Sequence, residues 1–147
     1  MDLNELLKAK GELTITVRDE KGLVKDVRHV PNLVVTVGKT YIASRMVGTS
    51  AAIMSNMAIG TGTTSPAAGD TGLGTEAGRV ALASGTASGS TVTYTATFPA
   101  GTGTGAITEA GVFNAGTGGT MLCRTVFPVV NKAAGDSIAI TWAVTVS

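Results

Sequence analysis

The chain has 147 residues and a formal net charge of +1, which fits one domain, or one domain with a short appendage. Charged residues make up 14% of the chain, against about 25% in average soluble domains, so a broad basic surface for nucleic acid is excluded. Only 4% of the residues are aromatic, so small and β-branched side chains must build the core, which favours packed sheets over a helical bundle.

Several protein classes are excluded by what the sequence lacks. The single cysteine, Cys123, rules out an intramolecular disulfide framework and lies in an apolar run, which predicts a buried, inert thiol. No apolar run approaches the ~18 residues of a membrane span. The first ten residues also lack the pattern of a signal peptide. We therefore expect a soluble protein made in the cytoplasm, without a membrane partner.

The first ten residues differ from the rest of the chain. Leu3, Leu6 and Leu7 share one face of a possible short helix. Two interpretations are open: an N-terminal turn, frayed or packed on its own domain, or an arm that becomes ordered on a neighbouring subunit. On the second interpretation, the three leucines are intersubunit contacts. The expected organisation is an arm or short helix over residues 1–11 and a β-sandwich domain over residues 12–147.

The next segment reads as a hairpin followed by a helix. Glu12–Asp19 and Leu23–Val30 alternate apolar and polar residues around a turn that contains Gly22, which predicts two paired strands. Pro31 is expected to end the second strand, with a short apolar run behind it. The spacing over Lys39–Val47 predicts the only internal helix.

A long run of turn-forming residues, Gly60–Gly78, follows a strand predicted over Ile53–Ile59. Loops of this length in a compact domain are typical of binding segments. We therefore expect contacts with other protein subunits from Pro66, Asp70 and Leu73.

The remaining chain alternates strands with Gly-rich turns. The cleanest strand is the last one, where large apolar residues alternate with small or hydroxyl residues. Eight or nine short strands with one helix indicate an all-β fold, an antiparallel β-sandwich of jelly-roll type. The predicted strands are Val80–Ser84, Thr91–Phe98 (paired across a loop at 85–90), Ile107–Phe113, Met121–Val129 and Ser137–Val146.

No motif for catalysis, a cofactor or a metal is complete. Gly38-Lys39-Thr40 resembles the end of a phosphate-binding loop, but Leu33 occupies the place of the required first glycine. The glycines near Gly60 and Gly101 miss the nucleotide-binding spacing. His29 is the only histidine, so sites that need two are excluded. We expect no enzymatic activity, no cofactor and no metal.

One acidic residue stands out from its surroundings. Glu109 lies in an otherwise apolar strand, while Glu76 and Arg79 flank the end of the long loop. A carboxylate in such a position lies at a solvated strand end or pairs with a base, here Arg79 or Arg124. We predict that Glu76, Arg79 and Glu109 take part in structural ion pairing that ties the loop to the sheet.

These segments, taken together from about Leu13 to the end, resemble a known module. It is the β-sandwich module of virion structural proteins of tailed bacteriophages, present in capsid decoration (cement) proteins, head fibres and tail-fibre or baseplate components. The segments that carry the resemblance are Asn32-Leu33-Val34-Val35, Ile59-Gly60-Thr61-Gly62-Thr63, Asp70-Thr71-Gly72-Leu73 with Glu76 and Arg79, Thr93–Phe98, Glu109–Phe113, Gly119–Leu122, and Lys132 with Gly135–Ile138 before Trp142.

The resemblance implies adhesion rather than catalysis. It implies a homotrimer that binds the major capsid protein on the outside of the head and stabilises the shell, made in the host cytoplasm and located on the virion. The chain stops at its last predicted strand, which favours a decoration protein over the alternative, a tail-fibre, baseplate or neck adaptor with the same fold. A small carbohydrate-binding sandwich is a weaker alternative, because Trp142 lies on a core face and only Tyr41 and Tyr94 remain as sugar platforms.

Overall fold

The computed structural model describes residues 9–48 and 51–146. Leu3, Leu6 and Leu7 therefore lie outside the described residues. Nine strands and one helix follow one another along the described chain: β1 (Ala9–Arg18), β2 (Val24–Val34), α1 (Thr36–Met46), β3 (Asn56–Gly60), β4 (Glu76–Ala81), β5 (Ser84–Ser88), β6 (Thr91–Phe98), β7 (Gly105–Phe113), β8 (Met121–Lys132) and β9 (Ser137–Val146).

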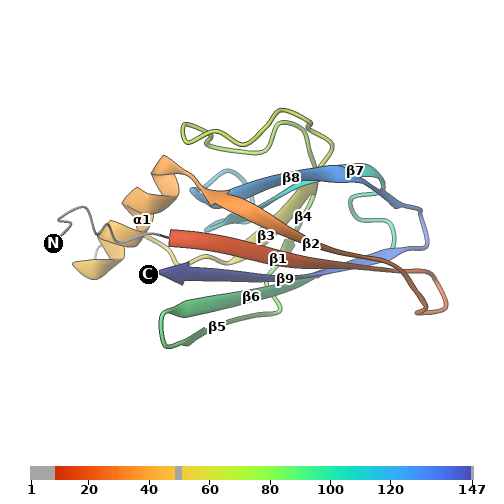
Figure 1. Ribbon diagram of the computed structural model, residues 1–147, viewed down its shortest axis with the longest axis horizontal. Helices are drawn as coiled ribbons and strands as arrows, with labels where there is room; N and C mark the ends of the chain where they lie inside the picture. Colours follow the sequence, from red (N-terminus) through yellow and green to blue (C-terminus); the bar gives the residue numbers. More distant parts are fainter. Residues whose placement is uncertain (1–8, 49–50, 147) are drawn as a thin grey trace, which may run out of the picture.

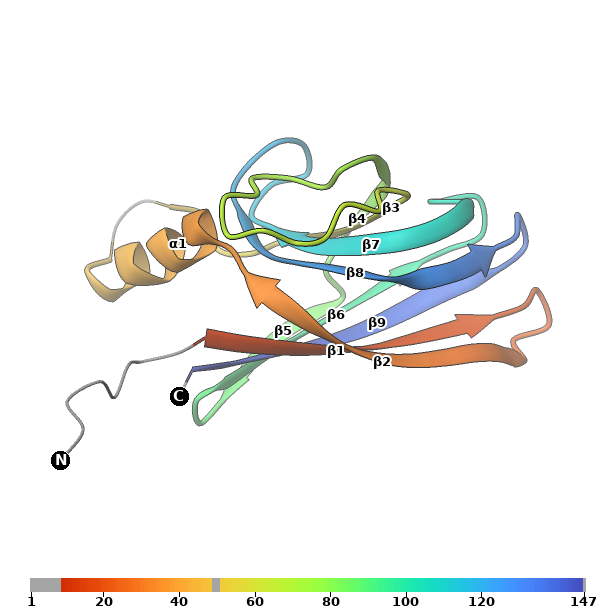
Figure 2. The ribbon, with the colours of Figure 1, turned by 45° about the horizontal axis from the view of Figure 1, so that its top comes forward.

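The strands form one antiparallel sheet in the order β4-β3-β7-β8-β2-β1-β9-β6-β5. The sheet curls into a half-barrel, so that β7 and β8 face β1 and β9 (Figures 1 and 2). The expected all-β fold with one short helix is confirmed. The expected jelly-roll sandwich of two separate sheets is corrected, because β2 pairs with β1 along most of its length and then, at Leu33 and Val34, with β8.

The two edges of the sheet are joined by consecutive residues. β4 and β5 lie at opposite ends of the strand order, yet only Leu82 and Ala83 separate them in the chain. The Leu82 N–H donates to the Ser55 carbonyl, and the Ala83 N–H donates to the Thr95 carbonyl. The chain thus crosses from one edge of the half-barrel to the other and holds the two edges close together.

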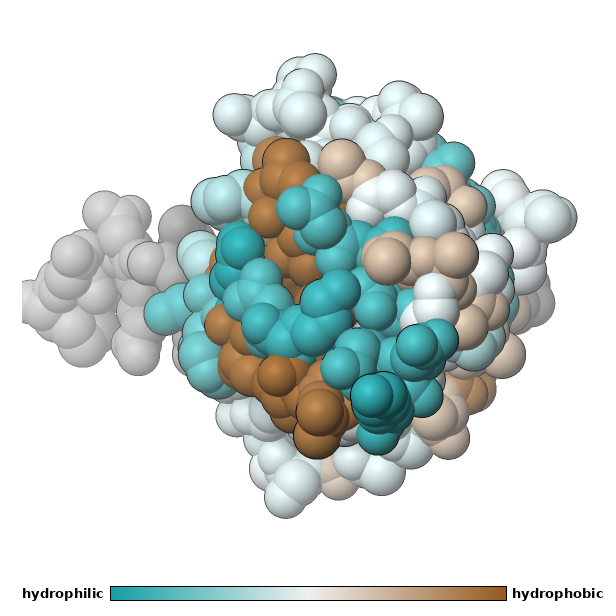
Figure 3. All heavy atoms as spheres, turned by 90° about the vertical axis from the view of Figure 1, so that its right-hand side faces the viewer, coloured by the Kyte–Doolittle hydropathy of each residue, from teal (hydrophilic) through white to brown (hydrophobic). Residues whose placement is uncertain are grey.

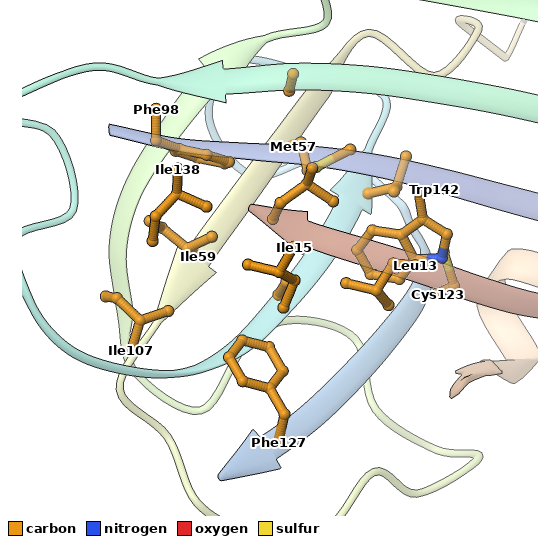
Figure 4. Packing of buried hydrophobic residues seen from close by; sticks show 14 of the residues in the cluster. Leu13, Ile15, Met57, Ile59, Phe98, Ile107, Cys123, Phe127, Ile138 and Trp142 are labelled. Atoms are coloured by element: carbon orange, nitrogen blue, oxygen red, sulfur yellow. The ribbon is translucent and has the colours of Figure 1, made fainter. Parts of the chain in front are cut away.

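The main core fills the concave side of the half-barrel (Figure 4). Every second residue of β9 from Ile138 to Val144 is buried, which confirms the predicted alternation and the predicted bounds of this strand. Trp142 and Cys123 are fully buried. The predicted burial of Cys123 is therefore confirmed, and burial raises the pKa of its thiol, which disfavours the reactive thiolate.

A second, smaller cluster lies on the convex side of β3, β7 and β8. It consists of Val35, Ala58, Phe113 and Met121, with Val37 and Leu73 packed against it. The beginning of α1 and the loop between β3 and β4 cover this cluster. These three strands are therefore buried on both faces over much of their length, which explains why they carry apolar residues on both faces instead of alternating.

Most strands differ from the sequence predictions at one or both ends: β1 begins at Ala9, inside the predicted arm, and β3 and β4 cover Asn56–Gly60 and Glu76–Ala81 in place of Ile53–Ile59 and Val80–Ser84. β7 begins at Gly105 and β8 ends at Lys132.

Three further differences have a local reason. β2 continues through Pro31, which is tolerated because β8 joins β2 only beyond this residue. The helix begins at Thr36, because Gly38 allows its first turn to approach β8: a Cβ atom there would lie 2.1 Å from the Leu122 carbonyl oxygen. β5, predicted as a loop, pairs along β6.

Candidate functional site

A buried carboxylate lies where the long loop meets the convex face of the sheet. Glu109 projects from β7 and is 0% exposed. Its two oxygens accept hydrogen bonds from the backbone N–H groups of Gly62 at 2.6 Å, Gly74 at 2.7 Å and Thr75 at 2.7 Å. All three donors belong to the loop between β3 and β4. Glu109 therefore holds both ends of this loop against the sheet.

Arg124, on the neighbouring strand β8, extends the same network. Its Nη2 atom lies 3.0 Å from Oε1 of Glu109 and 2.9 Å from the Thr64 carbonyl oxygen. Its Nη1 atom lies 2.9 Å from Oδ2 of Asp70. The Arg124 side chain is only 3% exposed, so one buried guanidinium links the sheet to the middle of the loop.

Gly62 makes the close approach of loop and carboxylate possible. A Cβ atom at this position would lie 2.3 Å from Oε2 of Glu109, closer than any side chain permits. The Gly60-Thr61-Gly62 segment resembles a nucleotide-binding turn in sequence, and the N–H group of Gly62 does bind an anion. That anion is the chain's own carboxylate.

The charge state of Glu109 follows from these contacts. Burial acts to raise the pKa of its carboxyl group, but the N–H groups of Thr75, Gly74 and Gly62 and the Arg124 side chain act to lower it. The donors outweigh burial, and the pKa lies below the ordinary value of 4.5. Glu109 is therefore ionised at neutral pH, as an ion pair with Arg124 requires.

This lowered pKa predicts how stability depends on pH. A carboxyl group whose pKa is depressed by folding stabilises the protein fully above its unfolded pKa, and the contribution is lost as pH falls through the folded pKa. We expect a constant difference in unfolding free energy between the wild type and Glu109→Gln above about pH 5, shrinking below it. Urea titrations from pH 7 to pH 2 measure this difference. A difference that shrinks already near neutral pH would contradict the assignment.

The three predicted ion-pairing residues belong to two separate pairs, one of which includes Arg124. The structure places Glu109 with Arg124 and places Glu76 with Arg79, whose Nη2 atom lies 2.6 Å from Oε1 of Glu76. Arg79 also lies over the Phe113 ring, 3.8 Å from its centroid. Its Nη1 atom donates to the carbonyl oxygens at 115 and 118 in the β7–β8 turn. This second pair therefore positions that turn.

The loop residues predicted as external contacts face their own domain to different degrees. Asp70 is paired with Arg124. Leu73 is half-buried against the convex-side cluster, and Pro66 is half-buried. The exposed positions of the loop are instead small and mostly hydroxyl-bearing, namely Thr61, Thr63, Thr64, Ser65, Ala67, Ala68, Gly69, Thr71, Gly74 and Thr75.

A second group of charges lies at the end of β8. The Lys132 side chain is buried, and its Nζ atom donates to the Pro99 carbonyl oxygen at 2.9 Å. Burial lowers its pKa, against the opposing effect of Asp136. Asp136 accepts bonds from Lys25 at 2.6 Å and from the Ala133 N–H at 2.8 Å. These contacts join the β8–β9 turn to β2.

Within residues 9–48 and 51–146, no group of three or more His, Cys, Asp or Glu side chains is placed to hold a metal ion. His29 is exposed, and its Nδ1 atom lies 3.1 Å from the Thr14 hydroxyl. No helix in the described part of the chain is long and apolar enough to cross a membrane.

Comparisons with protein-family models, with curated proteins and with solved structures find no match for this chain.

Proposed function

We propose that this protein is a virion structural protein of a tailed bacteriophage, a decoration protein that binds the outside of the head and stabilises the shell. The observation that carries the proposal is the loop held by Glu109 and Arg124. Burying charged groups is costly unless each is paired. Apart from the bond between Glu109 and Arg124 themselves, their partners are groups of the loop and hold it in one conformation. A loop that is already ordered loses little entropy on binding, which suits a permanent contact between subunits.

The surface of the molecule supports an adhesive role. Figure 3 shows apolar side chains gathered at the end that carries the β1–β2 turn, between polar ones. Leu23 and Val24 at this turn are 64% and 54% exposed, and Val27 and Val129 are each 46% exposed. Exposed apolar side chains that gather in this way are typical of surfaces that bind another protein. The major capsid protein and further copies of this chain are the proposed partners, with a homotrimer as the proposed assembly.

The number of copies per virion tests this proposal. Quantitative mass spectrometry of purified particles measures this protein relative to the major capsid protein. We expect a ratio near one-to-one, or another fixed large fraction. A handful of copies would support the alternative, a tail-fibre, baseplate or neck adaptor. Absence from the particle would overturn both proposals. The carbohydrate-binding alternative has little support, because Trp142 is 0% exposed.

A further inference from the structure

The end of the half-barrel beside α1 contains an open apolar groove. Tyr41 of α1 and Val92 and Tyr94 of β6 line its centre. One part, with a volume of about 450 Å³, extends to Ile53 before β3. The adjoining part, of about 220 Å³, extends to Val146 at the end of β9. At this end of the half-barrel, the apolar core is therefore open to solvent.

The groove exposes apolar surface that the domain itself does not cover. Ile53 is 63% exposed, and Val92, Tyr41 and Tyr94 are each only half-buried. Partial burial, with smaller contributions from Tyr41 and Cys123, raises the pKa of the Tyr94 hydroxyl to about 12. Ser55, Ser84 and Thr86 also line the larger part of the groove, but only apolar side chains would complete the burial of Ile53, Val92 and the two tyrosine rings.

The N-terminal segment of the chain has the chemistry of a suitable occupant. Ala9 pairs with Val146, so the residues that precede β1 join the domain at the rim of this groove. Their leucines, at positions 3, 6 and 7, share one helical face, and their charged residues are Asp2, Glu5 and, next to β1, Lys8. Among the described residues that line the groove, only Arg45 carries a charged side chain. Apolar anchors therefore match apolar walls, and Asp2 and Glu5 near the leucines can pair with the single cation.

The sequence at the junction favours the groove of another copy over the chain's own groove. To reach its own groove, the chain would have to reverse direction just before Ala9. Residues 6–10 read Leu-Leu-Lys-Ala-Lys and contain none of the Gly, Pro, Asn or Asp residues that tight reversals use.

We propose that Leu3, Leu6 and Leu7 of one copy occupy the groove between α1 and β6 of a neighbouring copy. Repeated around a symmetry axis, this exchange closes a ring in which each copy gives one segment and receives one. This contact would assemble the multimer that the proposed function calls for, and its role on a virion rests on that proposed function. It concerns the contact between copies of this chain, so it is tested on the purified protein alone.

Paired cysteines test the contact directly. The variant Leu6→Cys/Ile53→Cys is oxidised with copper phenanthroline and separated on a non-reducing gel; Cys123 is fully buried and does not compete. We expect covalent multimers that reduction returns to single chains. The matched control is Leu6→Cys/Thr97→Cys, since Thr97 is an exposed residue of β6 outside the groove lining, and we expect at least tenfold less cross-linking.

Three results would overturn the inference: no cross-link, a cross-link within one chain, or equal cross-linking in the control. A second measurement uses light scattering to determine mass in solution. Val92→Glu, which places a charge in the groove, is expected to shift the protein toward monomer, whereas Thr97→Glu, at an exposed position outside the groove, is not. Equal masses for wild type and Val92→Glu would contradict the contact. If these tests fail while the protein is abundant on virions, only the exchange of segments is lost and the proposed function stands.

Discussion

Replacing Glu109 with alanine is expected to lower the free energy of unfolding by about 3–5 kcal/mol, because removing one partner of a buried ion pair leaves the other uncompensated. Arg124 would keep Asp70 and the Thr64 carbonyl as partners but lose its only fully buried counter-charge. The N–H groups that bind the carboxylate would lose their acceptor as well. In a chain of this size the loss corresponds to a decrease in melting temperature of roughly 10 °C. Differential scanning calorimetry measures it.

The matched control for this substitution is Glu76→Ala. Glu76 also forms an ion pair with an arginine, but its side chain is 37% exposed, and exposed pairs contribute about 1 kcal/mol or less. We expect a decrease in melting temperature of at most a few degrees for the control. Equal effects of the two substitutions, or an unchanged melting temperature for Glu109→Ala, would show that the loop is not held by its buried carboxylate.

Replacing Trp142 with alanine is expected to lower the free energy of unfolding by about 3–5 kcal/mol, the usual result of removing a buried aromatic ring. Trp142 is 0% exposed and lies between Leu13 of β1 and Tyr94 of β6 in the register of the sheet. Its loss would leave a cavity where β1, β9 and β6 meet. Urea unfolding followed by circular dichroism measures the change, because the variant lacks the only tryptophan.

Trp142→Phe separates the packing of the ring from its polar atom. The indole N–H is buried and has no hydrogen-bond partner among the described residues, and an unpaired buried donor costs about 1–3 kcal/mol. Phenylalanine removes this donor and keeps most of the apolar volume. We therefore expect Trp142→Phe to lose less than half as much stability as Trp142→Ala. Equal losses would mean that the shape of the indole, rather than apolar volume, decides the packing here.

The accuracy of the sequence predictions differs among the strands for a physical reason. Ser137–Val146 was predicted with its observed bounds, because one face of this strand meets the core and its residues alternate accordingly. β5 was predicted as a loop, because Ser84–Ser88 is an exposed edge strand of small residues without alternation. It becomes a strand because it pairs with β6, and this pairing produces no recognisable pattern in the residues of β5 itself.

The candidate site could be predicted only in part. An acidic residue in an apolar strand indicated that Glu109 needs a partner, and Arg124 was one of two candidates for it. The backbone donors at Gly62, Gly74 and Thr75 were missed, because N–H groups have no residue signature. The available signal was the glycine spacing of the loop, which fits the close approach of an anion as well as it fits a tight turn.

The sequence by itself determined the all-β class, the first hairpin, the single internal helix and the core face of the last strand. These properties depend on neighbouring residues, because side chains alternate along a strand and recur every 3.6 residues along a helix. The tertiary structure decided that one sheet curls into a half-barrel and that Glu109 binds the long loop. Both depend on contacts between residues far apart in the chain, such as Leu33 with Arg124 and Gly62 with Glu109, 47 positions later. No local pattern encodes which of these distant groups will meet.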